Sequence, residues 1–135
     1  MKKFRIGIIG LGMGKSHIEG FQSHPAGEVV AITDLDKEKL ASVAAKYNIP
    51  ATYTDAAEML ASEKLDIVSV VTPNKFHKDL TLAALKAGCH VLCEKPMCAT
   101  LNEALLLIGR QQQAGKQVGI GYQWSYSPAI LRAKA

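Results

Sequence analysis

The sequence has no long apolar run and no cluster of basic residues. No apolar run approaches the ~20 residues that a membrane-spanning helix needs, so we expect no membrane span. Residues 1–5 lead straight into a strand pattern, without the apolar core and cleavage site of a signal peptide, and predict a cytoplasmic protein. The 16 basic and 12 acidic residues leave a net charge of +4, and the lysines are dispersed. This favours an ordinary surface that tolerates an anionic cofactor over a nucleic-acid-binding protein.

Cysteines are also few, and their spacing excludes the usual cysteine frameworks. The three cysteines, Cys89, Cys93 and Cys98, match no zinc or disulfide pattern. Cys89 and Cys93 flank and enter an apolar stretch, so we expect small buried thiols rather than redox or metal-binding groups. The sequence therefore predicts no metal site.

What the chain does have is a regular alternation of strand-like and helix-like segments. The expected strands are residues 4–9, 29–33, 51–53, 67–71, 90–93 and 117–121, and the expected helices are residues 14–23, 36–48, 55–61, 75–87, 100–114 and a last one from 128. The length of 135 residues and the hydrophobic content of 48% suit one globular domain. Together they predict an α/β fold, a doubly wound parallel sheet (Rossmann fold) with helices on both faces.

A glycine loop follows the first expected strand directly. It consists of Gly10, Leu11, Gly12, Met13 and Gly14. A strand, a tight glycine turn and a helix start form the layout that binds a dinucleotide pyrophosphate, with Gly10 in the turn and Gly12 close to the phosphates. The spacing G-x-G-x-G is one residue shorter than G-x-G-x-x-G, because Lys15 stands where the third glycine is usual. A tight turn without a ligand is the alternative interpretation.

Polar residues follow two further strands, at what would be the same edge of the sheet. Asp34 lies 24 residues after Gly10, close to the spacing of an acid that binds the adenosine ribose. A carboxylate there would repel a 2′-phosphate, which favours NAD over NADP; the alternative is that Asp34 caps the next helix, a role that Asp36 can fill. Lys95, after the fifth main strand, can orient a substrate hydroxyl and stabilise its developing charge, or be a solvated lysine in a turn.

The chain resembles the N-terminal NAD-binding domain of the glucose-fructose oxidoreductase / inositol dehydrogenase / MocA (Gfo/Idh/MocA) family. Three features carry the resemblance: the glycine loop followed by His17, the segment Thr72-Pro73-Asn74 with His77 three residues on, and the segment AGCHVLCEKP at residues 87–96, similar to the family pattern AGKHVxxEKP.

The resemblance implies a cofactor, a reaction and a set of site residues. The implied cofactor is NAD, with NADP less favoured, and the implied reaction is hydride transfer between a secondary alcohol of a sugar or cyclitol and the nicotinamide. The implied cofactor-binding residues are Gly10, Leu11, Gly12, Met13, Gly14, Asp34, Thr72, Pro73, Asn74, His77, Glu94 and Lys95. Glu94 would contact the nicotinamide ribose and Lys95 the reacting hydroxyl, with His77 as the local candidate for a base. We expect these residues to form a single groove.

Two departures from the family pattern qualify these expectations. Residues 123–128 lack the arginine that many members carry there, and the substrate domain that follows in family members is missing. We therefore expect residues 1–121 to be the dinucleotide-binding domain and residues 122–135 to be a connector and the start of that second domain. We expect this chain to bind the cofactor but to turn over poorly or not at all. The alternative is a non-catalytic NAD-binding regulator. The apolar tail formed by Trp124, Tyr126, Ile130 and Leu131 predicts a homo-oligomer.

Overall fold

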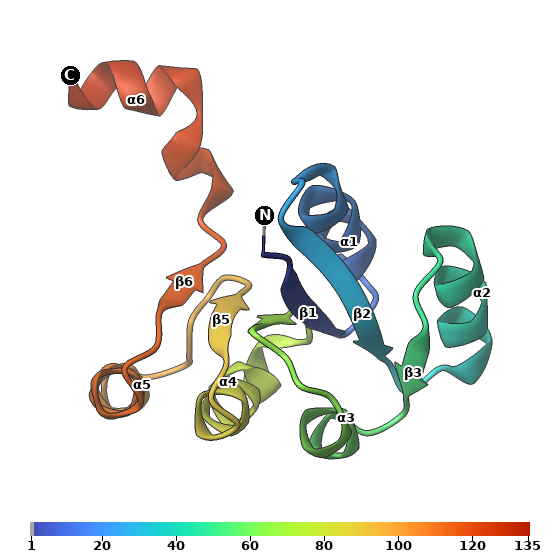
Figure 1. The fold of residues 1–135 in the computed structure, drawn as a ribbon. Helices are drawn as coiled ribbons and strands as arrows, with labels where there is room; N and C mark the ends of the chain where they lie inside the picture. The colour runs from blue at the N-terminus through green and yellow to red at the C-terminus, as the bar shows by residue number, and fades with distance from the viewer. Residues whose placement is uncertain (1) are drawn as a thin grey trace.

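A six-stranded parallel sheet forms the centre of the molecule, as a computed structural model shows for residues 2–135 (Figure 1). The order of its strands is β3-β2-β1-β4-β5-β6. Their bounds are β1 Phe4–Ile9, β2 Gly27–Thr33, β3 Ala51–Tyr53, β4 Ile67–Val70, β5 His90–Cys93 and β6 Val118–Ile120. All five pairings between neighbouring strands are parallel. The chain thus winds outward in both directions from β1 and β4, which confirms the predicted doubly wound fold.

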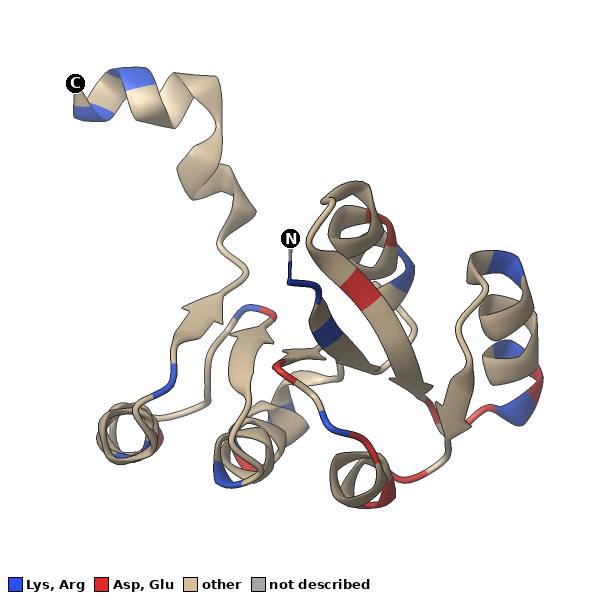
Figure 2. Cartoon of the chain, viewed as in Figure 1, with Lys and Arg blue, Asp and Glu red and all other residues tan. Residues whose placement is uncertain are grey.

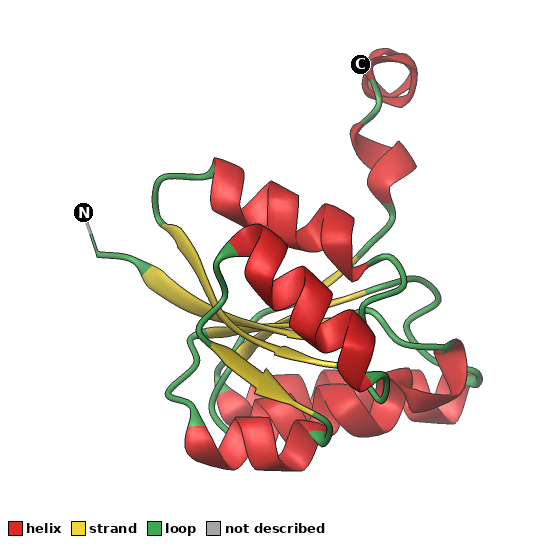
Figure 3. Ribbon diagram, turned by 90° about the vertical axis from the view of Figure 1, so that its right-hand side faces the viewer, coloured by secondary structure: helices red, strands yellow, loops and turns green. Residues whose placement is uncertain are grey.

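Helices cover both faces of this sheet, as Figures 1 and 3 show: α1 and α2 lie on one face, and α3, α4 and α5 on the other. The helices are α1 Gly14–Ser23, α2 Lys37–Tyr47, α3 Ala56–Ser62, α4 His77–Lys86, α5 Leu101–Ala114 and α6 Pro128–Lys134, with short 3₁₀ helices η1 Asn74–Phe76 and η2 Gln123–Tyr126. Within β1, Ile6 and Ile8 pack on the first face and Ile9 on the second. Burial on both faces explains the nearly continuous apolar runs of the central strands.

Most helix starts lie where the sequence predicts them, because the capping residues form the expected hydrogen bonds. Asp36 and Asp55 accept bonds from the first turns of α2 and α3. Thr100 and Glu103 form a capping box at α5. The exception is the helix expected from residue 75: a 3₁₀ turn, η1, comes first and α4 begins at His77. Such 3₁₀ turns are common at helix ends.

The last segments stand apart from the sheet, as Figure 1 shows for α6. Trp124 and Tyr126 are 75% and 77% exposed. Figure 2 shows basic and acidic residues interspersed along the chain. None of the helices in residues 2–135 is long and apolar enough to cross a membrane.

Candidate functional site

The carboxyl ends of the parallel strands meet at one edge of the sheet, and the loops singled out in the sequence lie there. The direction of winding reverses between β1 and β4, the neighbouring central strands. In open α/β sheets, ligands bind in the crevice that such a reversal leaves. The loops that follow β1 and β4 contain Gly10 and Thr72, and those that follow β2 and β5 contain Asp34 and Glu94.

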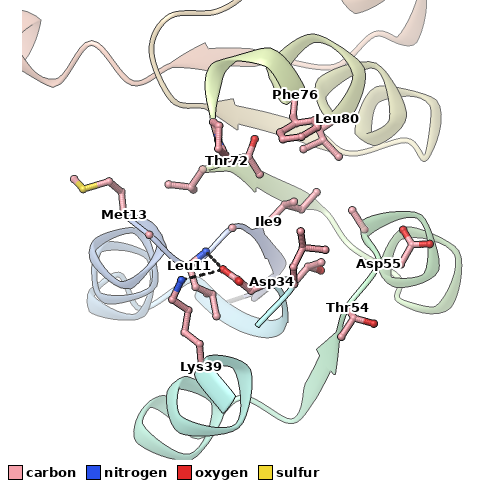
Figure 4. A pocket seen from close by; sticks show the side chains of 17 residues that line it. Ile9, Leu11, Met13, Asp34, Lys39, Thr54, Asp55, Thr72, Phe76 and Leu80 are labelled. Carbon is pink, nitrogen blue, oxygen red and sulfur yellow. Dashed lines mark hydrogen bonds and ion pairs between the residues drawn. The ribbon is translucent and has the colours of Figure 1, made fainter. Parts of the chain in front are cut away.

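A cavity of about 760 Å³ opens at this reversal point (Figure 4). The predicted site residues in its wall are Gly10, Leu11, Gly12, Met13, Asp34, Thr72 and Pro73. The sequence analysis did not single out its other side chains, among them Leu35, Lys39, Thr54, Phe76 and Leu80. Figure 4 shows Asp34 between Leu11 and Lys39, opposite the wall that contains Phe76 and Leu80. The cavity therefore combines two carboxylates, those of Asp34 and Asp55, with a largely apolar lining.

Gly10 is required by the fold itself. Its φ of +93° lies in the left-handed region that favours glycine. A Cβ added there would lie 2.5 Å from the carbonyl oxygen of Val71, because the chain leaving β1 passes close to the end of β4. Gly10 therefore allows the tight turn that brings the glycine loop to the edge of the sheet.

Gly12 has no comparable requirement from packing. A Cβ added to Gly12 would have no atom within 4 Å, whereas one added to Gly14 would lie 3.3 Å from side-chain atoms of Ile8 and Leu11. Gly14 thus allows α1 to pack against β1. The space over Gly12 is open and adjoins the cavity, which favours the ligand-binding interpretation of the glycine loop over a turn without a ligand.

The start of α1 adjoins the same cavity through its N-cap residue, Met13. Met13 is the N-cap residue and makes no side-chain cap, and the first turn contains no acidic residue. The first amides of a helix need acceptors, and the helix dipole makes this end electropositive. Together with the open space over Gly12, this end fits the pyrophosphate of a dinucleotide.

Asp34 is bound to the glycine loop. Its Oδ2 accepts a hydrogen bond of 2.9 Å from the backbone N–H of Leu11 and lies 3.5 Å from the Lys39 Nζ. Its Oδ1 accepts a bond of 3.0 Å from the Asp36 N–H. Burial alone would raise the pKa of the Asp34 carboxyl, but these backbone bonds and the charge of Lys39 outweigh it and lower the pKa. Since Asp36 caps α2, Asp34 is free of that role.

A second cavity, of about 420 Å³, lies on the other side of the glycine loop. Its wall includes Met13, His17, Phe21, Glu94 and Gln123, and Met13 also lines the first cavity. These two cavities adjoin one loop and share Met13, so the single groove expected from the sequence stays a prediction.

Four predicted site residues line neither of these cavities: Gly14, Asn74, His77 and Lys95. The His77 ring is fully buried, with Nδ1 2.6 Å from the carbonyl oxygen of Pro96 and Nε2 2.8 Å from that of Thr72. It therefore ties the loop after β4 to the loop after β5. The Lys95 side chain is exposed at the same edge.

Two of the three cysteines, Cys89 and Cys93, lie in an environment that disfavours the reactive thiolate. Cys89 and Cys93 are buried, as predicted, and no cysteine is paired. Burial raises the pKa of both thiols, that of Cys93 to about 11. Within residues 2–135, no group of three or more His, Cys, Asp and Glu side chains is placed to hold a metal ion.

Comparisons with known proteins agree with this geometry. A model of the Gfo/Idh/MocA oxidoreductase family, described as an NAD-binding Rossmann fold, matches residues 4–122. The chain is 31% identical over 131 residues to a D-apiose dehydrogenase of Paraburkholderia graminis and 34% identical over 125 residues to a D-glucoside 3-dehydrogenase of Escherichia coli. These alignments cover 96% and 91% of this chain, which spans 35% and 36% of the length of the two relatives.

A solved structure shows the same fold with a cofactor. It is the scyllo-inositol dehydrogenase of Lactobacillus casei with bound NAD(H) and scyllo-inositol, and it superposes with a TM-score of 0.92 at 25% identity. The superposition covers 98% of this chain and 40% of that one.

Proposed function

The chain belongs to the Gfo/Idh/MocA oxidoreductase family, with its NAD-binding Rossmann fold, and on this premise we propose how its own residues hold NAD. The first cavity takes the adenosine half, with Asp34 accepting hydrogen bonds from the ribose hydroxyls. The amides of the glycine loop and of the first turn of α1 take the pyrophosphate. The second cavity takes the nicotinamide half, beside Glu94.

One observation carries this assignment: Asp34, Gly12 and the uncapped start of α1 adjoin one cavity, with nothing over Gly12. A carboxylate is suited to a vicinal diol and free amides to a pyrophosphate. A ligand that has both groups a few ångströms apart is a nucleoside diphosphate or a dinucleotide. The negative charge of Asp34 favours NAD over NADP.

The residues in the loops after β4 and β5 would serve hydride transfer at the nicotinamide end of the cofactor. Bound NAD would supply a hydride acceptor at the nicotinamide ring. Lys95, exposed at the edge of the sheet, would bind the hydroxyl of the substrate and stabilise its oxygen as the proton leaves. The catalytic role expected for His77 stays a prediction; its contacts with two backbone carbonyls favour a role in holding the two loops together.

The substrate class rests on the relatives. Their names include an apiose dehydrogenase and a glucoside dehydrogenase, so the proposed reaction is oxidation of a secondary alcohol on a sugar or cyclitol. The exposed Lys95 favours this dehydrogenase over a non-catalytic NAD-binding regulator. The family match ends at residue 122, which supports residues 1–121 as the cofactor-binding domain and 122–135 as a connector.

The chain would form a homo-oligomer and work in the cytoplasm. A second copy of the chain would cover the exposed side chains of Trp124 and Tyr126 and make a homo-oligomer. The unpaired cysteines fit the reducing cytoplasm.

Calorimetric titration tests the cofactor assignment. The purified chain is titrated separately with NAD, NADH and NADPH at one salt concentration. Binding of NADH at micromolar concentration, with weaker binding of NADPH, is the expected result. Absence of heat with both reduced cofactors would contradict the assignment.

A further inference from the structure

A mostly buried chain of hydrogen bonds joins α1, β4 and the loop after β5 at the wall of the second cavity. In α1, His17 Nδ1 lies 2.8 Å from the Oγ of Ser69 in β4, and its Nε2 lies 3.0 Å from Oε1 of Glu94 after β5. Ser69 is fully buried, and the side chains of His17 and Glu94 are 12% and 20% exposed. A ring protonated at Nε2 satisfies both contacts, since it donates to Glu94 and accepts from Ser69.

The carboxylate of Glu94 is fixed from two other sides as well. Its Oε2 accepts a hydrogen bond of 3.2 Å from the backbone N–H of Lys95. A Cβ added to Gly121, just after β6, would lie 2.8 Å from Oε1. The carboxylate thus lies against bare backbone on one side and against the ring of His17 on the other, and rotation away from the cavity wall would break both of its hydrogen bonds.

Ser69 stands out in its strand. The strand β4 is otherwise apolar, with Ile67, Val68 and Val70. A fully buried hydroxyl in such a strand is costly unless it is paired, and His17 is its partner. The pairing fixes the ring plane of His17, which in turn directs Nε2 at Glu94.

We propose that His17 is a positioning residue, which holds the Glu94 carboxylate at the wall of the second cavity and so sets the affinity for the nicotinamide half of NAD. The inference rests on the proposed function. His17 acts through Glu94, whereas the adenosine half and the pyrophosphate bind in the first cavity and at the glycine loop. The effect of His17 is therefore confined to ligands that extend beyond the pyrophosphate.

Two substitutions separate the contacts of His17. The amide of His17→Gln reaches the place of Nε2 and retains a donor for Glu94, whereas the shorter amide of His17→Asn reaches only the place of Nδ1 and retains the contact with Ser69. If His17 positions Glu94, the Gln variant keeps the wild-type affinity for NADH and the Asn variant loses it. If His17 serves only to satisfy Ser69, the order is reversed.

The experiment compares NADH with ADP, which has the adenosine and pyrophosphate but no second ribose. In His17→Asn, the Kd for NADH is expected to rise about fivefold or more, in line with loss of a bond to a charged group, and the Kd for ADP to stay within twofold. In His17→Gln both stay near wild type. His24→Leu, at the exposed end of α1, is the control for loss of a histidine and leaves both affinities unchanged.

Gly121→Ala provides a second test that leaves His17 in place. Its Cβ displaces the Glu94 carboxylate, so NADH binding is expected to weaken and ADP binding to persist. Equal loss of NADH and ADP in the Asn and Gln variants, or unchanged NADH binding in Gly121→Ala, would overturn the proposal. If the wild-type chain binds ADP and NADH equally well, the inference fails and the cofactor site stands; if it binds neither, the proposed function itself fails.

Discussion

The backbone N–H of Leu11 donates a hydrogen bond of 2.9 Å to Oδ2 of Asp34, although 23 residues separate them. This bond ties the glycine loop to the end of β2 before any nucleotide is bound. The same carboxylate therefore contributes to the shape of the loop and, in our proposal, to recognition of the ribose. Several expected outcomes depend on this double role.

Asp34→Asn should weaken NADH binding about ten- to hundredfold, the range expected for losing hydrogen bonds to a charged acceptor. The amide oxygen can still accept from Leu11, which keeps the tie to the glycine loop, while the Asp36 N–H loses its acceptor because the amide NH2 is a donor. NADPH should lose much less affinity, because the charge that repels its 2′-phosphate is gone. Calorimetry gives both constants. Asp36→Asn is the matched control, since asparagine also caps a helix; an equal loss of NADH binding in that variant would contradict the ribose role.

Lys39→Met should make the chain more selective for NADH. The Lys39 Nζ lies 3.5 Å from Oδ2 of Asp34 and partly neutralises it in the cavity wall. Without that charge the carboxylate repels a 2′-phosphate more strongly, so the ratio of the Kd values for NADPH and NADH should rise about threefold or more. Lys46→Met, in the last turn of the same helix, should leave the ratio unchanged. A fall in the ratio would show that Lys39 does not act through Asp34.

Gly10→Ala and Gly12→Ala should separate folding from binding. Alanine at position 10 meets both a positive φ and the Val71 carbonyl, so unfolding free energy should fall by about 2 kcal/mol or more. Alanine at position 12 meets no atom of the chain, so stability should stay within about 0.5 kcal/mol, while NADH binding falls tenfold or more. Denaturant melts and NADH titrations measure the two effects. Normal NADH binding by Gly12→Ala would remove the pyrophosphate assignment.

Acid should cancel the contribution of Asp34 to stability. Because folding lowers the pKa of this carboxyl, the native state favours the ionised form. The resulting stabilisation is complete above the pKa of an unfolded aspartate, about 3.9, and is lost as the pH falls through the lower native value. The stability difference between the wild-type chain and Asp34→Asn should therefore be constant near neutral pH and shrink below about pH 4. Melts at several pH values check this, and a difference that persists at the lowest pH would contradict it.

The chain should bind NAD without oxidising alcohols. Lys95 is exposed, whereas the His77 ring is buried with both nitrogens against backbone carbonyl oxygens, an arrangement that does not favour His77 as the base for a hydroxyl held by Lys95. Formation of NADH with myo-inositol or a methyl glucoside, followed by absorbance, should not exceed the rate without protein. The D-glucoside 3-dehydrogenase of Escherichia coli, assayed with its own substrate, is the positive control. Ordinary turnover by this chain would refute the expectation.

The fold was predictable because local signals repeat along this chain. Apolar β-branched runs mark the strands, and residues such as Asp36 and Thr100 mark helix starts. The family resemblance is confirmed as well. The contact between His17 and Ser69 was not predictable, because it depends on how α1 crosses the neighbouring strand β4. The available signs were His17 after the glycine loop and a serine within an apolar run.

The residues that line each cavity were also not predictable from sequence spacing. Met13 lines both cavities, and a Cβ added to Gly14 would lie 3.3 Å from a side-chain atom of Ile8, so the start of α1 packs closely against β1. Sequence spacing gives the order of the loops along the edge but not such packing distances. The same limit applies to His77, whose carbonyl partners belong to two separate loops.

The two cavities share one lining residue, Met13, and both take part of their walls from the β1–α1 unit, the first from the glycine loop and the second from α1. Asp34, Leu35 and Lys39 come from one short stretch that has no part in the second cavity. Exchange of that stretch for its counterpart in another family member should transplant cofactor preference as a unit and leave the redox half of the site as it is. The fold thus lets a protein engineer change the stretch that recognises the adenosine without altering any residue that lines the second cavity.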